Sequence, residues 1–476
     1  MFQAKVREHR YRVIADRIEQ SIADGVYEPG ERIASIRQLA ESFAASINTM
    51  KSALNLLQDR GLIESRPRAG TYVVSRPEVF EGSEYVDDLV DAVIEEYTCR
   101  PAAAPTTAKM DHAVLPQELV PADLIKSAMQ AAASTQSPLL DGFATFERTA
   151  ELRSLVSQRE MLHGIAINPD QLVLASSIEQ TVFQLLVTLN PQRLPVAVQA
   201  PTYYGHLTIL RALGMPAFEL PTMPDGSFSV ARLAEAVRRN QVGIALLDTA
   251  VHNPTGSCLP ESVLAEIAHL VDETQLKVIE YGMLRDMRYT TSASPSLYSL
   301  APSGSVFLCS SYAETLVPSI KAAWVAAGTH ATHVRDRWQA TSCTVSALQL
   351  AILEHMLASG KVRRVQDHNR KLVYESLTAA AELVQDTFPA GSQVTAPSGG
   401  FALWIRMPEG VSGRDIFRAA RKEGIAIAPG AMFARCQDDY DGWIRVAPGI
   451  LNHDKEQALR RLATLVADGE RHLVDS

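Results

Sequence analysis

The fold assignment depends on residues 306–324, which read VFLCSSYAETLVPSIKAAW. This stretch opens with the apolar run 306–309, which is typical of a buried strand. A polar segment follows, and the small apolar residues 322–327 then predict a second strand. Periodicity alone therefore indicates a strand, a polar loop and another strand.

Outward from this stretch, apolar runs alternate with helical patterns from about residue 110 onward, which predicts an α/β domain with a mostly parallel sheet. The candidate strands of this sheet are 172–175, 196–199, 244–247, 277–280 and 306–309. A long helical stretch at 345–384 precedes two strand-like runs, 401–407 and 443–446. These last elements predict a second, smaller α+β domain.

The order of residue types in the central stretch resembles the segment that carries the Schiff-base lysine in fold-type I aminotransferases, S-x-S-K-T-x-x-P-G-x-R-x-G. The serine, threonine and proline are in register, but Glu314 stands at the lysine position and Ala313 at the serine before it. Ser319 replaces the glycine, and Lys321 replaces the arginine that grips the cofactor phosphate. The resemblance implies a pyridoxal phosphate (PLP) scaffold without its imine-forming amine.

Three other landmarks of class I/II aminotransferases are present. The resemblance implies that Asn253, in HNPTG, binds the phenolic oxygen of the cofactor and that Tyr203, in PTYYG, stacks on its pyridine ring. Arg445, in GWIRV, stands where the family clamps a substrate carboxylate, a task suited to a planar guanidinium. Alternatively, Asn253 only holds a turn and Arg445 forms a structural salt bridge.

The positions that carry the chemistry are changed. A PLP enzyme needs an amine for the imine and a carboxylate that keeps the pyridine nitrogen protonated. The resemblance places Tyr281 at the carboxylate position and Leu284 at that of a tyrosine that binds the phenolic oxygen. At the phosphate-binding helix the chain has Ser177 and, two residues later, Glu179, which would repel a phosphate although helix N-termini attract anions.

A further motif, Y-x4-G-x3-L-R, also lacks its tyrosine and its glycine, and its counterparts are Phe143, Arg148, Leu152 and Arg153. We therefore expect no covalently held PLP, although weak non-covalent binding of PLP is compatible with the sequence. The histidines, among them His252, His330 and His333, lack the company that a metal site needs. The expected ligand pocket comprises Ser177, Tyr203, Asn253, Tyr281, Glu314, Lys321 and Arg445.

The N-terminal segment predicts helices and a hairpin. A first helix carries apolar residues at helical spacing, namely Tyr11, Val13, Ile14, Ile18 and Ile22, and stops at Asp24-Gly25. Two further helices are expected to start near Ser35 and Ser46, the second with an apolar stripe of Thr49, Met50, Ala53, Leu54 and Leu57. Residues 62–74 then read as a two-stranded wing with a basic tip.

This segment resembles the winged helix-turn-helix of GntR-type regulators through DG-x3-PGER, S-x-R-x-LA, S-x-NT-x-K-x-AL and GLI-x9-TYV. The resemblance implies binding to double-stranded DNA, with the last helix in the major groove. The expected DNA-facing residues are Arg37, Asn48, Thr49 and Lys51, with Arg66 and Arg68 on the wing. Ile47 departs from the arginine common at its position, and the simpler interpretation is a solvated basic face.

Four parts are expected: a winged helix-turn-helix domain at 1–75, a linker at 76–110, a large domain at 111–335 and a small domain at 336–476. Joined in this order, they resemble the MocR subfamily of GntR regulators. The chain has 46% hydrophobic and 21% charged residues, which is typical of a globular protein. A net charge of −9 argues against nucleic acid coating the whole molecule, but not against a local basic face.

Five scattered cysteines without a CxxC motif favour a reducing compartment over a disulfide framework or zinc site. With neither an apolar signal region nor a run long enough to span a bilayer, the sequence predicts a cytoplasmic protein. Our hypothesis is a dimeric transcriptional regulator that binds paired DNA half-sites and senses a small carboxylate or amino acid without transamination. The alternatives are an aminotransferase with a tethered DNA-binding unit and a ligand-free dimerisation scaffold.

Overall fold

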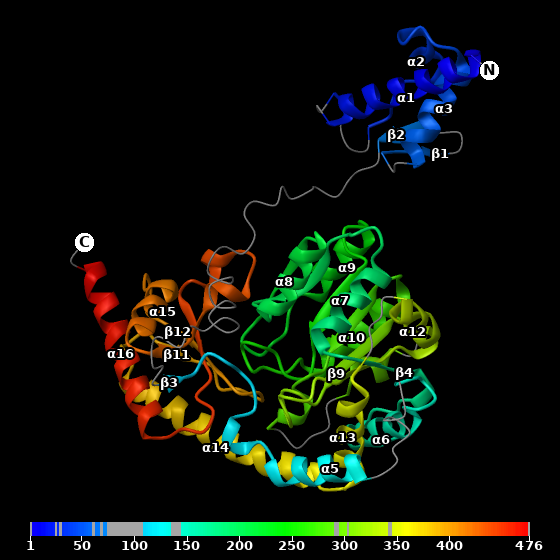
Figure 1. Cartoon of the computed structure of the whole chain (residues 1–476). Helices are drawn as coiled ribbons and strands as arrows, with labels where there is room; N and C mark the ends of the chain where they lie inside the picture. The colour runs from blue at the N-terminus through cyan, green and yellow to red at the C-terminus, as the bar shows by residue number, and fades with distance from the viewer. Residues whose placement is uncertain are drawn as a thin grey trace. The chain divides into compact units, whose positions relative to one another are not determined.

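The structure is a computed structural model, and it describes residues 2–23, 26–27, 31–59, 62–66, 70–73, 108–134, 144–289, 295–301, 304–340 and 345–474. Contacts within the chain divide it into two compact units, Met1–Ser83 and Glu84–Ser476 (Figure 1). The expected linker lies almost entirely outside the described residues. Each unit is therefore described by itself.

The N-terminal unit consists of three helices and a hairpin, as predicted. The helices are α1 (Phe2–Ala23), α2 (Ile36–Ser42) and α3 (Ile47–Asp59), and the antiparallel strands are β1 (Ile63–Arg66) and β2 (Gly70–Val73). Its core includes Ile14, Ile18, Leu39, Met50, Ala53 and Leu57. The prediction was wrong for Val13, which is 41% exposed because α1 turns Ile14 and Ala15 inward instead.

Serines determine where the second and third helices begin, and both predicted starts are confirmed. Ser35 caps α2 in a capping box, in which its hydroxyl accepts from the backbone N–H of Gln38 while its own N–H donates to the Gln38 side chain. The Ser46 hydroxyl accepts from the backbone N–H of Thr49 at 3.1 Å, which satisfies a free donor at the start of α3. The predicted end of the first helix, at Asp24-Gly25, lies outside the described residues.

A seven-stranded sheet with the order β4-β10-β9-β8-β7-β5-β6 forms the centre of the C-terminal unit. Its strands are β4 (Leu172–Ala175), β5 (Val196–Ala200), β6 (Ala217–Pro221), β7 (Ile244–Asp248), β8 (Lys277–Tyr281), β9 (Val306–Ser311) and β10 (Ala323–Ala326). All neighbouring pairs are parallel except those of β10, which is antiparallel to β4 and β9. The five predicted strands and the strand expected within 322–327 are confirmed, whereas β6 was not predicted.

Helices cover both faces of this sheet (Figure 1). They include α7 (Ile178–Leu189), α8 (Tyr204–Leu213), α9 (Val230–Arg238), α10 (Glu261–Glu273), α11 (Leu297–Leu300) and α12 (Ala331–Ala340). Successive strand residues enter different cores, since Leu246 and Ile279 belong to one hydrophobic cluster and Ala245 and Val278 to another. Strands buried on both faces explain why the runs are mainly apolar instead of alternating.

The smaller domain is built on a four-stranded sheet with the order β11-β12-β15-β14. Its elements are β11 (Gln393–Val394), β12 (Leu403–Arg406), β13 (Ile425–Ala426), β14 (Ala428–Pro429), β15 (Trp443–Val446), α15 (Gly413–Lys422) and α16 (His453–Val474). The strands predicted at 401–407 and 443–446 are confirmed as β12 and β15. The helical stretch predicted at 345–384 is confirmed and consists of two helices, because Gly360, at φ +68°, separates α13 (Ala347–Ala358) from α14 (Val362–Thr387).

A short strand, β3 (Ala108–Lys109), joins the beginning of the described C-terminal unit to the smaller domain. It pairs in parallel with β13, and Met110 continues the contact by donating to the carbonyl of Ala426 at 2.9 Å. The chain then passes through α5 (Ala122–Ser134) and α6 (Ala150–Glu160), and α13 packs against both helices. Short 3₁₀ turns lie at Gln117–Leu119, Met161–His163, Pro169–Gln171, Arg285–Met287, Gly328–His330, Gly430–Phe433 and Gln437–Tyr440.

Candidate functional site

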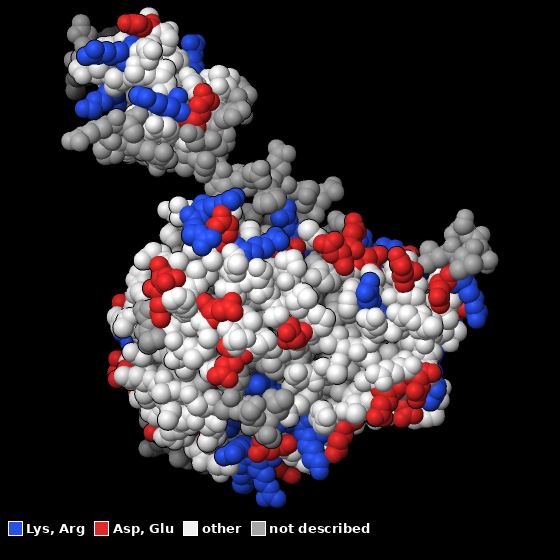
Figure 2. Space-filling view, turned by 180° about the vertical axis from the view of Figure 1, so that it is seen from behind, with Lys and Arg blue, Asp and Glu red and all other residues white. Residues whose placement is uncertain are grey.

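The predicted DNA-facing residues of α2 and α3 are exposed. Arg37 lies on α2, and Asn48 and Lys51 lie on α3, all three among the solvent-exposed residues. Figure 2 shows several Lys and Arg side chains on the visible face of this unit. The geometry is thus compatible with phosphate and base contacts from these side chains, which remain predictions.

Thr49 differs from its neighbours, because its hydroxyl lies 2.8 Å from that of Ser46, within the cap of α3, and is only partly exposed. Of the two predicted wing residues, Arg66 belongs to β1 without a described side chain, and Arg68 lies outside the described residues. Arg32 was missed. A Cβ at Gly70, which adopts φ +118°, would lie 2.6 Å from its Nε, so this glycine lets the Arg32 guanidinium lie against β2.

The predicted ligand-pocket residues gather at one edge of the large sheet. Ser177 follows β4, Tyr203 follows β5 and Asn253 follows β7, while Tyr281 ends β8 and Glu314 follows β9. These strands run parallel, so their carboxyl ends meet at the same edge, where open α/β sheets bind ligands. Ser177 itself caps α7, because its hydroxyl accepts from the backbone N–H of Gln180 at 3.1 Å.

Two tyrosine rings stack on each other in this pocket. The ring centroids of Tyr203 and Tyr281 are 6.4 Å apart with an interplanar angle of 29°, and His206 meets Tyr281 edge-on at 4.7 Å. Carbon atoms in contact are about 3.5–4 Å apart, so a third ring inserted between two others needs roughly 7–8 Å between them. The 6.4 Å between the centroids of Tyr203 and Tyr281 is shorter than this, so no further ring fits between the two.

Glu314 places a carboxyl group where the motif that this stretch resembles has a lysine. Its Oε2 atom is buried without a hydrogen-bond partner among the described residues. Burial, and then the carboxylate of Glu179, raise the pKa of Glu314 to about 7, although Lys321 acts in the opposite direction. Burial together with Glu179 and Glu314 also raises the pKa of both Tyr203 and Tyr281, so these two carboxylates act on the same small region.

Glu314→Gln is expected to stabilise the protein at pH 8 and to have little effect at pH 4.5. Because the folded state raises the Glu314 pKa from 4.5 to about 7, the folded protein keeps a proton that the unfolded chain releases in this window. The contribution of Glu314 to the free energy of unfolding therefore falls as the pH rises, and the neutral glutamine avoids roughly 1–3 kcal/mol of this loss. Urea unfolding of both proteins at the two pH values measures the difference.

The matched control for this experiment is Glu266→Gln, on the exposed face of α10. It should give the same small change at both pH values. A stability difference between wild type and Glu314→Gln that does not vary with pH would contradict the assignment. Asp248, whose pKa burial raises to about 8, contributes a slope of the same sign in every protein compared and therefore cancels.

Arg445 links the two domains of the C-terminal unit. It is 3% exposed, and its Nη1 donates to Asn253 Oδ1 at 2.9 Å while its Nη2 donates at 2.5 Å to the carbonyl of Asp111. Its guanidinium lies 4.8 Å from the ring centroid of Phe433, and its Nε has no partner among the described residues. The terminal nitrogens of the predicted carboxylate clamp are therefore engaged by protein acceptors, and Nε is the donor left over.

Sequence reasoning missed a buried polar group beside Tyr281. Asp248 pairs with Tyr281 in the sheet register and is 2% exposed, and its Oδ1 has no hydrogen-bond partner among the described residues. Nearby, burial lowers the pKa of His206 to about 3 and that of His252 to about 4, so both imidazoles are neutral. An aspartate that ends an otherwise apolar strand was the signal that could have identified this group.

Glu280, the residue before Tyr281, accepts several hydrogen bonds at the same edge of the sheet. Its fully buried carboxylate accepts from the hydroxyls of Thr249 and Ser296, both at 2.6 Å, and from the backbone N–H of Tyr298 at 2.8 Å. It also forms a salt bridge with Arg285 at 3.2 Å. Every one of these partners is a donor, so the buried carboxyl oxygens of Glu280 are satisfied by hydrogen bonds.

The residues present do not fit PLP. Glu314 offers no amine, and Tyr281 offers no carboxylate and stacks its ring on that of Tyr203. Glu179 lies in the first turn of α7, where a phosphate would need positive charge. The upstream motif does not compensate, because Phe143 lies outside the described residues and Arg153 is committed to Pro169, Thr149 and Asp170.

The described residues contain no group of three or more His, Cys, Asp or Glu that could hold a metal ion. His252 is buried and lies 2.8 Å from the Thr255 hydroxyl, whereas His330 and His333 are exposed. Over the same residues, no helix is both long and apolar enough to cross a membrane.

Two protein families match the chain. Aminotransferase class I and II matches residues 116–462, and the gntR family of bacterial regulatory proteins matches residues 10–73. Similar proteins include the uncharacterized HTH-type transcriptional regulator YdcR of Escherichia coli, which is 27% identical over 96% of this chain and 99% of that protein. The corresponding regulator YjiR of Escherichia coli is 24% identical over 96% of this chain and 98% of its own.

Enzymes are also similar to part of this chain. The 2-aminoadipate transaminase of Thermus thermophilus is 24% identical over 61% of this chain and 72% of its own. Among solved structures, the multiple substrate aminotransferase from Thermococcus profundus superposes with a TM-score of 0.72 at 18% identity, covering 81% of this chain and 96% of that chain. At this identity the superposition establishes the fold and not the activity.

Proposed function

We infer the function from one premise: the chain belongs to the aminotransferase class I and II family and joins that fold to a gntR-family regulatory domain, which is the MocR-type arrangement. At the coarse level it is a DNA-binding regulator. In finer terms, we propose that the aminotransferase-like part dimerises and senses an effector without transamination, and that the paired N-terminal units bind DNA half-sites. The observation that carries the absence of transamination is Glu314 at the position of the imine-forming lysine.

The geometry around Glu314 supports this proposal. A carboxyl group cannot form an imine, and the Tyr203–Tyr281 stack engages the ring surface that the chemistry would need. The alternative, an active aminotransferase with a tethered DNA-binding unit, would require another amine and another carboxylate at the same places. Asp248 carries a carboxyl group on the adjacent strand, where it pairs with Tyr281 in the sheet register. The alternative can therefore be tested by substitutions of Tyr281 and Glu314.

The purified protein is expected to show no absorbance band of a PLP aldimine and to gain no PLP adduct after borohydride reduction. The reason is that Glu314 supplies no amine, while Glu179 and Glu314 oppose an incoming phosphate. Mass spectrometry of the reduced protein, after incubation with PLP, measures the adduct and assigns it to a residue.

Glu314→Lys is the matched control, because it restores an amine at the same place and reports whether the conditions detect an imine. It is not expected to restore amino-group transfer, since position 281 still lacks the carboxylate that keeps the pyridine nitrogen protonated. An adduct on Lys321 of the wild-type protein, or robust transamination by Glu314→Lys, would contradict the proposal.

The proposed effector at this site is a small carboxylate or an amino acid bound by Arg445 near Asn253. Such a carboxylate would exchange with the acceptors that Arg445 now uses, Asn253 Oδ1 and the carbonyl of Asp111. In this exchange, an anionic carboxylate replaces two neutral acceptors at a buried guanidinium and so forms stronger, charge-assisted hydrogen bonds.

A further inference from the structure

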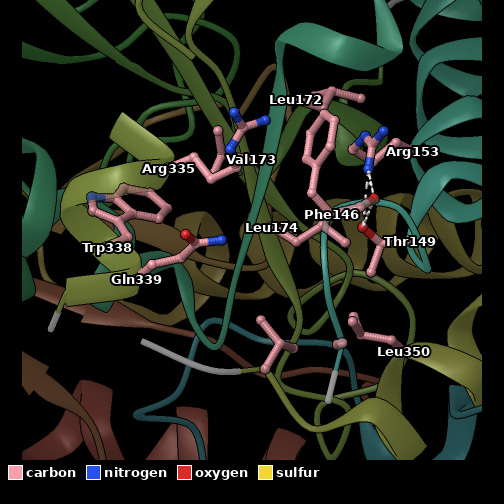
Figure 3. A pocket seen from close by; sticks show the side chains of 12 residues that line it. Phe146, Thr149, Arg153, Leu172, Val173, Leu174, Arg335, Trp338, Gln339 and Leu350 are labelled. Carbon is pink, nitrogen blue, oxygen red and sulfur yellow. Dashed lines mark hydrogen bonds between the residues drawn. The ribbon is translucent and has the colours of Figure 1, made fainter. Parts of the chain in front are cut away.

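A separate cavity of about 160 Å³ lies between α6, β4, α12 and α13, away from the ligand pocket described above (Figure 3). It shares no residue with that pocket. Its lining consists of Ala144, Phe146, Thr149, Arg153, Leu172, Val173, Leu174, Arg335, Trp338, Gln339, Val345 and Leu350.

Most of the cavity wall is apolar. Leu172 and Leu174 on β4, Leu350 on α13 and the Trp338 ring on α12 surround a space similar to the roughly 150 Å³ cavity known to hold a benzene molecule. The volume of the cavity therefore fits a ligand whose apolar body is about one six-membered ring or a short branched chain. Burial of such a body is driven by the apolar area that leaves water.

Two side chains of α12 bring hydrogen-bond donors to this apolar space. Figure 3 shows Arg335 and Gln339 extending from α12 toward the space beside Phe146. The Arg335 guanidinium lies 4.3 Å from the Phe146 ring centroid, and its side chain is 25% exposed. Among the described residues its ion-pair partner is the adjacent Asp336, at 3.7 Å from Nε, which leaves the terminal nitrogens available.

The charges around the cavity favour an anion. Among the described residues, no Asp or Glu lines the cavity, whereas two arginines do. Arg153 contributes a fixed charge, because its guanidinium stacks on Phe146 and bonds to Thr149, Pro169 and Asp170. The nearby carboxylates of Asp336 and Glu147 lie outside the lining and are exposed, so water screens them.

We propose that this cavity binds a small monocarboxylate with a compact apolar body, whose carboxylate is held by the Arg335 guanidinium and the Gln339 amide. Planar guanidinium and carboxylate groups match in two parallel hydrogen bonds, and the Phe146 ring behind Arg335 keeps the guanidinium in place. The proposal does not depend on the effector site at Arg445 or on DNA binding.

Isothermal titration of the full-length protein with benzoate tests the proposal, with benzamide as a neutral probe of the same shape. Benzoate is expected to bind one site per chain, at least about ten-fold more tightly than benzamide, because a charged hydrogen bond replaces a neutral one. Arg335→Gln should lower the affinity for benzoate to that for benzamide, while leaving benzamide binding unchanged.

The matched control is Arg337→Gln, which removes the same charge from the exposed side of the same helix without touching the cavity. It should retain the affinity for benzoate. If Arg335→Gln and Arg337→Gln lost the same affinity for benzoate, the effect would be a general electrostatic attraction, and the proposal would be overturned. Absence of benzoate binding, as when a second copy of the chain covers the cavity, would also overturn it.

Discussion

Glu280→Gln is expected to lower the free energy of unfolding of the C-terminal unit by about 3–5 kcal/mol, because it leaves the buried Arg285 guanidinium without its anionic partner. The substitution keeps the size of the side chain but replaces an acceptor oxygen by an NH₂ group. That group would face donors, since Thr249, Ser296 and two backbone N–H groups all donate to this carboxylate. Urea unfolding followed by tryptophan fluorescence measures the change.

Tryptophan fluorescence reports on the C-terminal unit alone, because the four tryptophans are Trp324, Trp338, Trp404 and Trp443. The matched control is Glu273→Gln, whose carboxylate is 62% exposed and pairs with His269 at the surface. It should change the stability by less than about 0.5 kcal/mol. If Glu280→Gln were as mild as this control, the contacts of Glu280 with Arg285 and the surrounding donors would not stabilise the unit as inferred.

The double variant Arg37→Ala with Lys51→Ala is expected to weaken DNA binding by roughly 100-fold or more, since a good base contact and a phosphate contact each contribute on the order of 1–3 kcal/mol. Loss of the Lys51 contact should also reduce the slope of log affinity against log salt by about one, because each phosphate contact releases condensed counterions. Both side chains are exposed, so the fold of the unit should not change. Fluorescence anisotropy with the protein's own operator DNA, at several salt concentrations, measures both effects.

Arg17→Ala is the control within the same unit, because it removes an exposed charge from α1 and leaves α2 and α3 intact. It should shift affinity only slightly and leave the salt slope nearly unchanged. If both proteins lost affinity to the same extent, the surface of α2 and α3 would not be the one that contacts DNA.

Most of the fold could be predicted because its signals are local. The strands of the large sheet are mainly apolar runs, and Ser35 and Ser46 are side chains that cap helices through their own hydroxyls. The helical stretch at 345–384 could be predicted from its apolar pattern, but its break at Gly360 could not, because a positive φ is a property of the turn and not of the periodicity. Val13 was misplaced for a similar reason, since a few apolar residues in a row do not reveal which of them faces the core.

The candidate site could be predicted only in part. The motif positions identified which side chains meet at the sheet edge, and the register of β7 and β8 brings Asp248 beside Tyr281 in a way that spacing along the chain does not reveal. The stacking of Tyr281 on Tyr203 likewise depends on tertiary packing. The cavity beside Arg335 assembles four separate elements, so no single stretch of sequence carries its signal.

The pairing of β3 with β13 determines where the DNA-binding unit is attached to the rest of the protein. The chain that leaves the N-terminal unit re-enters described structure at Ala108, as an edge strand of the smaller domain, and Ala447 donates to the Met110 carbonyl at 2.7 Å to secure it further. The smaller domain therefore holds the point at which the chain from the N-terminal unit re-enters described structure. A rotation of this domain about the large sheet would move the anchor point, whereas a change confined to the large sheet would leave it in place. The distance between a spin label beside this anchor and one on the large sheet would consequently measure any such rotation of the smaller domain.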